Sequence, residues 1–460
     1  MSSAPDEQSG HDQPALRREA GLFQLVAYGV GNIIGAGIYV LVGEASGLAG
    51  GMVWAAFLIG AAIATFTGLS YAELSSMYPK AASEYIFLGR AYGSRFLSFL
   101  TGWTMLATEV VAIAAVALGF AGYLNSLIDV PEMLAAATML VLLACLVLVG
   151  IKQSLSVNTV LSVIAIGGLA VVIVLGLFFP TDGVEAQHLT MPTLGIEGLL
   201  AATALVFFAY IGFDNIANLA EETKRPERTI PMGLVLSVAI STLLYVLVGF
   251  AATSLATPAE LDASDAPLAL AASRALGDSA FNVLAVTALL TTLNTCLVLI
   301  IVSSRMVYGM SREGVLPIAA GRVSRKNGSP YVAVVLVLAA ALCFLTLGST
   351  AAIARVTSFG SLLTFVLVNL AMLHLRRVAP DMRRPFKAPM SVGWLSITGA
   401  IGLLSCLVML TRFNWQTALL GFALPATGAV VFWLYGRRQP LGGDGPLHEP
   451  HERSDWSVWR

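Results

Sequence analysis

The sequence predicts an all-α polytopic membrane protein. Of its 460 residues, 57% are hydrophobic and only 12% are charged, and the mean hydropathy is +0.81. A soluble chain of this length needs a large charged surface, and this composition cannot supply one. The formal net charge of −1 indicates no particular partner, so the placement of the charges along the chain is the more informative feature.

Twelve segments are apolar enough to cross the hydrocarbon core as helices, which takes about 20 residues. In chain order they are 21–42, 52–76, 87–123, 133–150, 155–179, 194–219, 230–255, 279–310, 331–348, 351–374, 393–411 and 416–436. An even number of spans places both termini on one side of the membrane. Residues 1–20 are polar and lack the apolar stretch of a signal peptide, and residues 437–460 are also polar. We expect both segments to be tails, the second of them disordered.

The basic residues predict the orientation. If the N-terminus is cytoplasmic, the inner loops and tails hold nearly all Lys and Arg, whereas the outer loops hold only Arg274 and Arg412 together with acids such as Asp262 and Asp265. Cytoplasmic loops of membrane proteins are enriched in Lys and Arg. We therefore expect a cell (inner) membrane protein with both termini in the cytoplasm.

The first span contains an unusual run of glycines, GVGNIIGAGIYVLVG at residues 29–43. Glycine inside a helix costs about 1 kcal/mol relative to alanine. The run is not a dinucleotide-binding fingerprint, because the glycines are out of register and no strand precedes them. Gly31 and Gly35 could form a GxxxG packing face. Alternatively, Gly35, Ala36 and Gly37 could leave helical geometry at mid-membrane and expose backbone groups to a substrate cavity.

A second interruption favours the broken-helix interpretation. The sixth span carries Gly212 beside Asp214, Asn215 and Asn218 within apolar sequence. Interrupted helices at positions one and six predict two five-helix repeats of inverted topology. We expect these repeats to form a ten-helix transport core at residues 21–380, followed by two accessory helices at 381–436.

Four stretches resemble motifs of the amino acid–polyamine–organocation permeases. They are GNIIGAGIY (31–39), GLSYAELSSMYPKAASEYIFLGRAYG (68–93), FFAYIGFDNIANLAEETKRPERTIP (207–231) and SSRMVYGMSREGVLP (303–317). The resemblance covers nearly the whole chain and is greatest to the bacterial and archaeal amino-acid permeases and to the cationic amino-acid transporters. It implies a leucine-transporter-like fold and transport of an amino acid by alternating access.

The resemblance also implies a backbone binding site for the amino-acid zwitterion. A half-helix N-terminus suits the carboxylate, because its N–H groups are free and its dipole is positive there, and unwound carbonyls suit the ammonium group. The expected N–H donors are Ala36, Gly37 and Ile38, and the expected carbonyl positions are Ile33, Ile34, Phe208, Ala209 and Ile211, with Gly35 and Gly212 at the breaks. Phe208 matches an aromatic gate of related permeases, and packing in the core is its alternative role.

Two acids inside the spans are candidates for proton coupling, since ionisable groups at membrane depth are costly. Glu109 resembles a third-helix glutamate of the cationic transporters, and an apolar span favours its neutral form, so it could take and release a proton. Its alternative role is a structural acid bonded to a neighbouring helix. Asp214 matches an acid of some proton-coupled or exchanging relatives, and its alternative role is a helix cap.

The coupling ion remains open at this stage. Some proton-coupled relatives carry a lysine in the fifth helix, but here Ala165 or Gly167 falls in that neighbourhood. Proton coupling, exchange and sodium coupling all stay possible. Hydroxyls for a sodium site exist in the eighth span, although we expect these side chains to bond to their own helix. They are Thr291, Thr292, Ser303 and Ser304.

Other classes of function have little support in the sequence. No His-Glu-X-X-His motif or other metal-ligand spacing occurs, so we predict no catalytic residue, no metal and no cofactor. The four cysteines lie apart in apolar segments, and we expect no disulfide. The basic residues occupy short loops rather than a nucleic-acid-binding patch. We predict an amino-acid substrate, neutral or broad in type, with cationic amino acids and polyamines as alternatives. A nutrient sensor is a more remote one. The sequence does not predict the oligomeric state.

Overall fold

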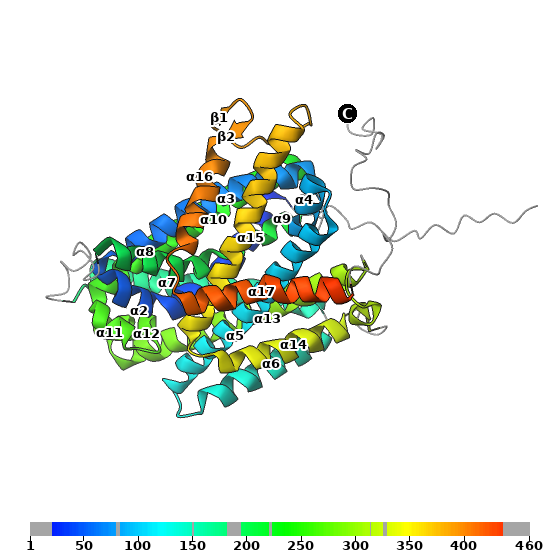
Figure 1. The fold of residues 1–460 in the computed structure, drawn as a ribbon. Helices are drawn as coiled ribbons and strands as arrows, with labels where there is room; N and C mark the ends of the chain where they lie inside the picture. The colour runs from blue at the N-terminus through cyan, green and yellow to red at the C-terminus, as the bar shows by residue number, and fades with distance from the viewer. Residues whose placement is uncertain are drawn as a thin grey trace, which may run out of the picture.

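The computed structural model describes residues 21–79, 83–149, 151–181, 195–219, 223–312, 314–324 and 329–435. The two expected tails lie outside the described residues. The described part is almost entirely helical, and its helices cross one another at varied angles around a packed centre (Figure 1).

The α-helices in chain order are α1 (Leu22–Ile33), α2 (Ala36–Ala49), α3 (Val53–Met77), α4 (Ser83–Tyr92), α5 (Arg95–Asn125), α6 (Glu132–Val149), α7 (Ile151–Phe178), α8 (Gly195–Val206), α9 (Asn215–Asn218), α10 (Pro226–Leu255), α11 (Pro258–Asp262), α12 (Pro267–Leu276), α13 (Asp278–Arg312), α14 (Tyr331–Phe344), α15 (Thr350–Val378), α16 (Ile397–Leu410) and α17 (Trp415–Leu434). Short 3-10 turns are η1 (Gly50–Met52), η3 (Phe207–Tyr210), η5 (Ile318–Gly321) and η6 (Leu345–Leu347). Strands β1 (Ser391–Val392) and β2 (Leu395–Ser396) pair antiparallel.

The expected all-α polytopic class is confirmed. Within the described residues, nine helical segments are long and apolar enough to cross a membrane, and α1, α14 and α16 are shorter apolar helices. Large apolar side chains also face outward on the peripheral helices, including Leu142, Val163, Val335, Leu404 and Trp433. Such a surface is unsuited to water and suited to lipid.

Two spans begin later than the sequence suggested. In place of one helix at 87–123, α4 ends at Tyr92 and α5 starts at Arg95. Gly93 turns the chain with a φ of 61°, and the Ser94 hydroxyl caps α5 by accepting from the Leu97 amide. The expected helix at 393–411 starts only at Ile397, because the preceding residues form the β1–β2 hairpin.

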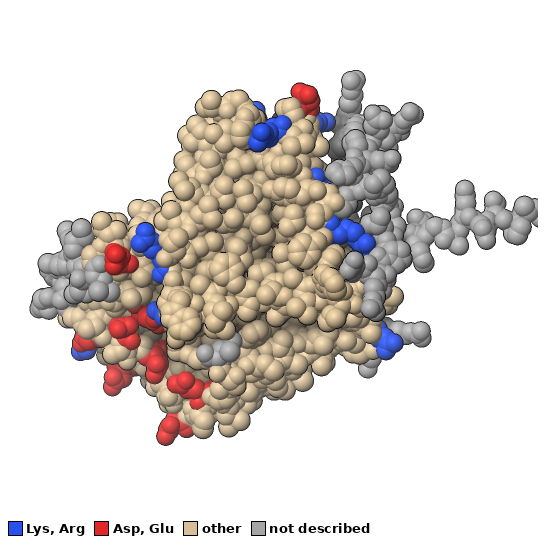
Figure 2. Space-filling view, viewed as in Figure 1, with Lys and Arg blue, Asp and Glu red and all other residues tan. Residues whose placement is uncertain are grey.

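Charge is segregated between the two ends of the molecule. In Figure 2 most acidic side chains gather at one end, over α11 and the start of α6, where a few basic side chains also lie, and the other basic side chains lie toward the opposite end together with one acidic side chain. The exposed acids at the first end are Asp129, Glu132, Asp262, Asp265 and Asp278, and exposed bases at the second include Arg312, Arg322, Arg377, Arg383 and Lys387. We refer to these as the acidic end and the basic end.

A buried ion pair fastens α3 to α15 near the basic end. Arg376 donates two hydrogen bonds to the Glu73 carboxylate, and both side chains are almost fully buried. The Ala388 amide also donates to Glu73 at 2.8 Å. Arg384 lies 3.3 Å from Glu73 through its Nε atom and donates to the last carbonyls of α15, including that of Leu375. The cluster therefore joins α3, α15 and the segment leading to β1.

Candidate functional site

The first expected span is interrupted near its middle. Helix α1 ends at Ile33, and Gly35 takes an extended conformation before α2 begins at Ala36. The break is shorter than the expected Gly35–Gly37 segment, because Gly37 already lies in the first turn of α2. The first amides of a helix lack intrahelical acceptors, and here the Ala36 amide donates to Thr295 Oγ1 at 3.0 Å.

The sixth expected span is interrupted as well. Helix α8 gives way to η3, then Ile211 is extended, and Gly212 has a φ of +116° that side chains rarely tolerate. A Cβ atom at Gly212 would lie 3.1 Å from the Asn32 carbonyl oxygen. Asp214 precedes α9 but does not cap it; its Oδ1 atom accepts from the Gly212 amide at 3.0 Å. Glycine thus permits both the turn and the close approach to α1.

The two breaks touch each other. A Cβ atom built on Gly37 would lie 2.6 Å from Ala209 Cα, so only glycine allows α2 to meet η3 at this distance. The Tyr245 hydroxyl of α10 lies between the Ile33 carbonyl and the Ala209 carbonyl, 3.1 Å from the latter. One buried hydroxyl therefore serves carbonyl groups from both breaks.

We expect Tyr245→Phe to lower the free energy of unfolding by about 1–3 kcal/mol, because two buried carbonyls lose the one hydroxyl hydrogen that they share. The midpoint of thermal unfolding in detergent measures the effect. Tyr331→Phe is the matched control, since Tyr331 is exposed. Equal midpoints for the two variants would contradict the linking role of Tyr245.

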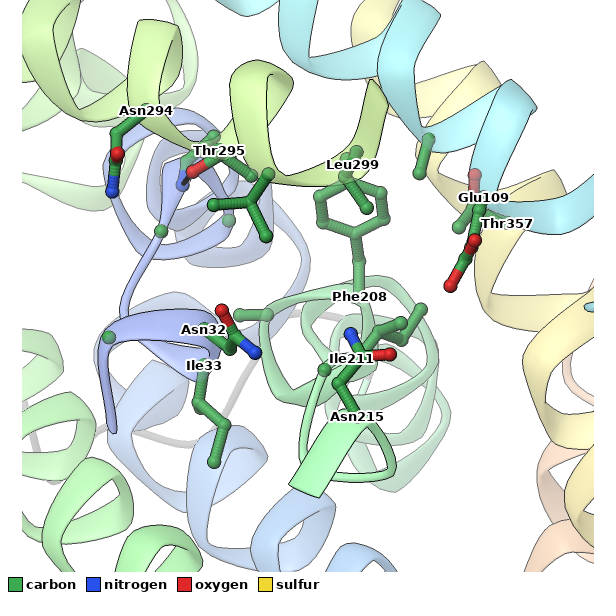
Figure 3. Close-up of a pocket in the computed structure, with 18 of the residues that line it drawn as sticks. Asn32, Ile33, Glu109, Phe208, Ile211, Asn215, Asn294, Thr295, Leu299 and Thr357 are labelled. Atoms are coloured by element: carbon green, nitrogen blue, oxygen red, sulfur yellow. Dashed lines mark hydrogen bonds between the residues drawn. The ribbon is translucent and has the colours of Figure 1, made fainter. Parts of the chain in front are cut away.

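The breaks form one wall of a cavity (Figure 3). Its lining includes eight of the ten residues expected to bind the substrate, namely Ile33, Gly35, Ala36, Gly37, Phe208, Ala209, Ile211 and Gly212. Ile34 and Ile38 are buried beside the cavity but are not part of its lining. The backbone groups of the expected site are therefore brought together around one space.

Glu109 and Asp214 are placed differently with respect to this cavity. Glu109 lines it, is 3% exposed, and accepts a hydrogen bond from Ser303 Oγ at 3.2 Å. In Figure 3, Glu109 and Thr357 lie on one side of the Phe208 ring, with Asn294 and Thr295 on the other. Asp214 is buried between two lining residues, Gly212 and Asn215, without lining the cavity itself.

The four hydroxyl groups that could serve a sodium site differ in their hydrogen-bond acceptors. Thr291, Thr292 and Ser304 donate to carbonyls of their own helix, α13, as expected. Of the four, only Ser303 donates to a residue of another helix, namely the Glu109 carboxyl group of α5. In the fifth expected span, Ser162 lies close to α1, and the Ala165 carbonyl accepts from the Tyr39 hydroxyl of α2 at 2.6 Å. Ser162 Oγ lies 2.9 Å from a Cβ built on Gly31, and Asn294 Nδ2 donates to it at 3.4 Å.

Ten lining residues were not predicted as site residues: three adjoin the breaks, and the other seven come from distant segments of the chain. They are Gly31, Asn32, Thr108, Ala112, Asn215, Asn294, Thr295, Val298, Leu299 and Thr357. Among the described residues, Asn294 Oδ1 has no partner within hydrogen-bonding geometry, and the polar atoms of the Asn32 side chain have none beyond an interaction with the Tyr28 hydroxyl. Buried polar groups are nearly always paired, so these atoms mark where a polar ligand can bind.

This architecture defines a multi-pass membrane transporter: apolar helices surround a buried cavity lined by the ends of two interrupted helices. Comparison with known proteins specifies the class. The amino acid permease family matches residues 21–434. The chain therefore belongs to the amino acid permease family, which confirms the expected family and its transport of amino acids.

Individual relatives span several substrate types. The chain is 30% identical to the branched-chain amino acid permease BcaP of Bacillus subtilis, over 93% of this chain and 94% of that protein. It is 28% identical to the methylthioribose transporter of the same organism, over 93% and 95% of the two chains. It is also 30% identical to the vacuolar cationic amino acid transporter 4 of Arabidopsis thaliana, over 80% of this chain and 64% of that protein. These relatives are transporters rather than enzymes.

Proposed function

We propose that the protein carries a neutral amino acid across the cell inner membrane by alternating access, coupled to a proton. One observation carries this proposal: the cavity combines the first turn of α2, where the Ala36 amide donates to Thr295 and Gly37 lines the wall, with carbonyls at both breaks and a single carboxyl side chain, that of Glu109. This arrangement offers donors for a carboxylate and acceptors for an ammonium group on the same wall.

The rest of the cavity favours an uncharged substrate side chain. With the backbone of an amino acid held by the breaks, its side chain would meet Phe208, Val298, Leu299 and Ala112. An aliphatic side chain gains free energy from burial there, about 25 cal/mol per Å² of apolar surface. The branched-chain permease among the relatives supports the same substrate class. The cationic transporters favour the alternative, in which an ionised Glu109 would pair with a basic side chain.

We also propose how the helices are arranged in the membrane. We place twelve spans in the membrane, with both termini cytoplasmic, so that the basic end faces the cytoplasm. Residues 21–380 form two inverted five-helix repeats of the leucine-transporter type, and residues 381–436 supply two accessory helices. The broken helices α1–α2 and α8–α9 are support for this arrangement, since inverted-repeat transporters bind substrate at such breaks.

Purified protein in liposomes tests the proposal. Uptake of labelled leucine, valine, alanine, lysine, arginine and putrescine is followed in sodium-free buffer, with and without an inward proton gradient. We expect accumulation of aliphatic amino acids that collapses when the gradient is dissipated. Exchange with preloaded amino acid but no accumulation would contradict proton coupling, and uptake only with sodium would replace the proton by sodium. Uptake of lysine alone would overturn the neutral substrate class.

The variant Glu109→Gln distinguishes two roles of the Glu109 carboxyl group, proton coupling and pairing with a basic substrate side chain. If Glu109 carries the proton, we expect the variant to lose about tenfold or more in gradient-driven accumulation while still exchanging substrate, because glutamine holds no transferable proton. Asp214→Asn should act in the same direction. Glu132→Gln, an exposed acid at the acidic end, is the control. Unchanged accumulation in Glu109→Gln, or loss of lysine affinity alone, would contradict the coupling role.

A further inference from the structure

Besides Glu109, Asp214 and Glu73, the carboxyl group of Glu84 is buried in the described part of the chain. Glu84 lies in the first turn of α4, which is outside the candidate membrane spans, and is only 2% exposed. Among the described residues, no Lys or Arg nitrogen lies within ion-pairing distance of it. Tyr71 of α3 donates to Glu84 Oε1 at 3.2 Å. An unpaired buried acid of this kind is costly and has no role in the site described above.

Tyr71 connects Glu84 with Asp214. The Tyr71 ring packs edge-on against Phe213, the neighbour of Asp214, with ring centroids 5.8 Å apart. Asp214 is near enough to Glu84 for the two carboxyl groups to interact electrostatically. Asp214 Oδ2 is fully buried and, within the described residues, has no hydrogen-bond partner. Glu84 and Asp214 thus lie near the same tyrosine, Tyr71. Asp214, the acid nearer the cavity, has an acceptor oxygen, Oδ2, without a donor among the described residues.

Hydroxyl groups of α15 lie along the same route. Thr357 lines the cavity, and Ser361 and Thr364 follow it four and seven positions later, which places them on one helical face. Ser361 and Thr364 are fully buried, and their hydroxyls have no partner in the part of the chain that the structure describes. Phe365, next to Thr364, packs 5.7 Å from the Tyr71 ring. Unsatisfied polar atoms therefore extend from the cavity to the level of Tyr71.

The surroundings of Glu84 set its protonation. Tyr71 faces it from α3, Asp214 from the link between η3 and α9, and Glu109 from α5. Cys406 of α16 lies behind Tyr71, and His374 of α15 stacks on Tyr92 at the far end of α4. Burial, and next the Asp214 charge, raise the pKa of Glu84 to about 7. Below that pH Glu84 is neutral and can donate a proton, and above it the carboxylate can accept one.

We propose that Glu84 is a second proton carrier, which passes a proton between Asp214 and water at the basic end through Tyr71 and the α15 hydroxyls. In each transfer the proton that leaves the Asp214 carboxyl group is taken up by the Glu84 carboxylate, which then releases it to water. The proposal rests on the proposed proton coupling. It gives a role to an acid of α4 that is buried with no counter-ion among the described residues, and to the α15 hydroxyls that have no partner there.

Glu84→Gln in proteoliposomes tests the inference, with Glu84→Asp as the conservative variant and Glu132→Gln as the control. We expect Glu84→Gln to lose about tenfold in gradient-driven accumulation while exchange of preloaded amino acid stays within about twofold of wild type. We expect wild-type uptake to have a pH inflection near 7, where Glu84 titrates, and Glu84→Gln to lack it. Glu84→Asp should recover part of the accumulation, because it restores a transferable proton.

The outcomes are distinguishable. Wild-type accumulation by Glu84→Gln would overturn the role of Glu84 and leave proton coupling intact. Equal loss of exchange and accumulation, in the Gln and Asp variants alike, would show a structural role and also overturn it. Wild-type protein that exchanges but never accumulates would overturn the coupling itself, and the Glu84 relay with it.

Discussion

Gly37→Val is expected to abolish substrate binding. The first atom of the new side chain would lie 2.6 Å from Ala209 Cα and 3.2 Å from the Ala209 amide nitrogen, and backbone atoms cannot rotate away as a side chain can. The start of α2 must then move away from η3. A displacement of about 1 Å in a positioned site costs on the order of a hundredfold, so we expect at least that loss of affinity in equilibrium binding of labelled substrate.

Two further variants keep this result interpretable. Gly167→Val changes a glycine of α7 whose Cβ would meet nothing within 4 Å, and we expect wild-type binding from it. Gly37→Ala adds only the Cβ atom and should give an intermediate loss. Monodisperse elution of each variant in detergent shows that it inserts and folds. Unchanged affinity in a well-folded Gly37→Val protein would contradict a binding site built from the two breaks.

Breaking the buried Glu73–Arg376 pair is expected to have the largest effect on stability. Glu73→Gln removes the carboxylate that accepts from Arg376 and from the Ala388 amide, and leaves a buried guanidinium without its counter-ion. Loss of one partner of a buried pair costs about 3–5 kcal/mol. We expect a decrease of that size in the free energy of unfolding, measured by denaturant titration in mixed micelles.

The exposed pair Glu260–Arg274 supplies the matched control. Its side chains are 38% and 46% exposed, and surface pairs contribute about 1 kcal/mol or less, so Glu260→Gln should change stability little. The double variant Glu73→Leu, Arg376→Met should recover much of the loss, because neither charge is then buried alone. Equal decreases in the free energy of unfolding for Glu73→Gln and Glu260→Gln would contradict a larger stabilising contribution from the buried pair.

The fold was readable from the sequence where the signal is local. Long apolar runs indicate helices directly, and glycines next to polar residues marked both interrupted helices. Short helices such as α4, α11 and α12 and the β1–β2 hairpin were missed, because segments of 2 to 10 residues are too short to show a periodic pattern. The Gly93–Ser94 turn shows this, since one positive φ and one hydroxyl separate two helices within apolar sequence.

The sequence predicted the site residues that a local pattern marks, but not the contacts between residues that are far apart in the chain. Backbone positions at the two breaks follow from glycine placement, and eight of them line one cavity. Thr295 is 259 residues from Ala36, the residue whose amide it accepts, and no local pattern connects the two. Glu84 was passed over for a similar reason: in the sequence it is one acid in a polar loop, and only the packing of Tyr71 shows that it is buried.

The shared Tyr245 hydroxyl has a thermodynamic consequence. Because it contacts carbonyls of both breaks, and Gly37 lies against Ala209, the ends of the two interrupted helices cannot shift independently without losing these contacts. A ligand held by either break therefore biases the position of the other, and the influence must be reciprocal. If an amino acid binds both breaks as proposed, its contact at one break strengthens its contact at the other, and a molecule that carries only one of the two groups loses this coupling as well as the missing contact.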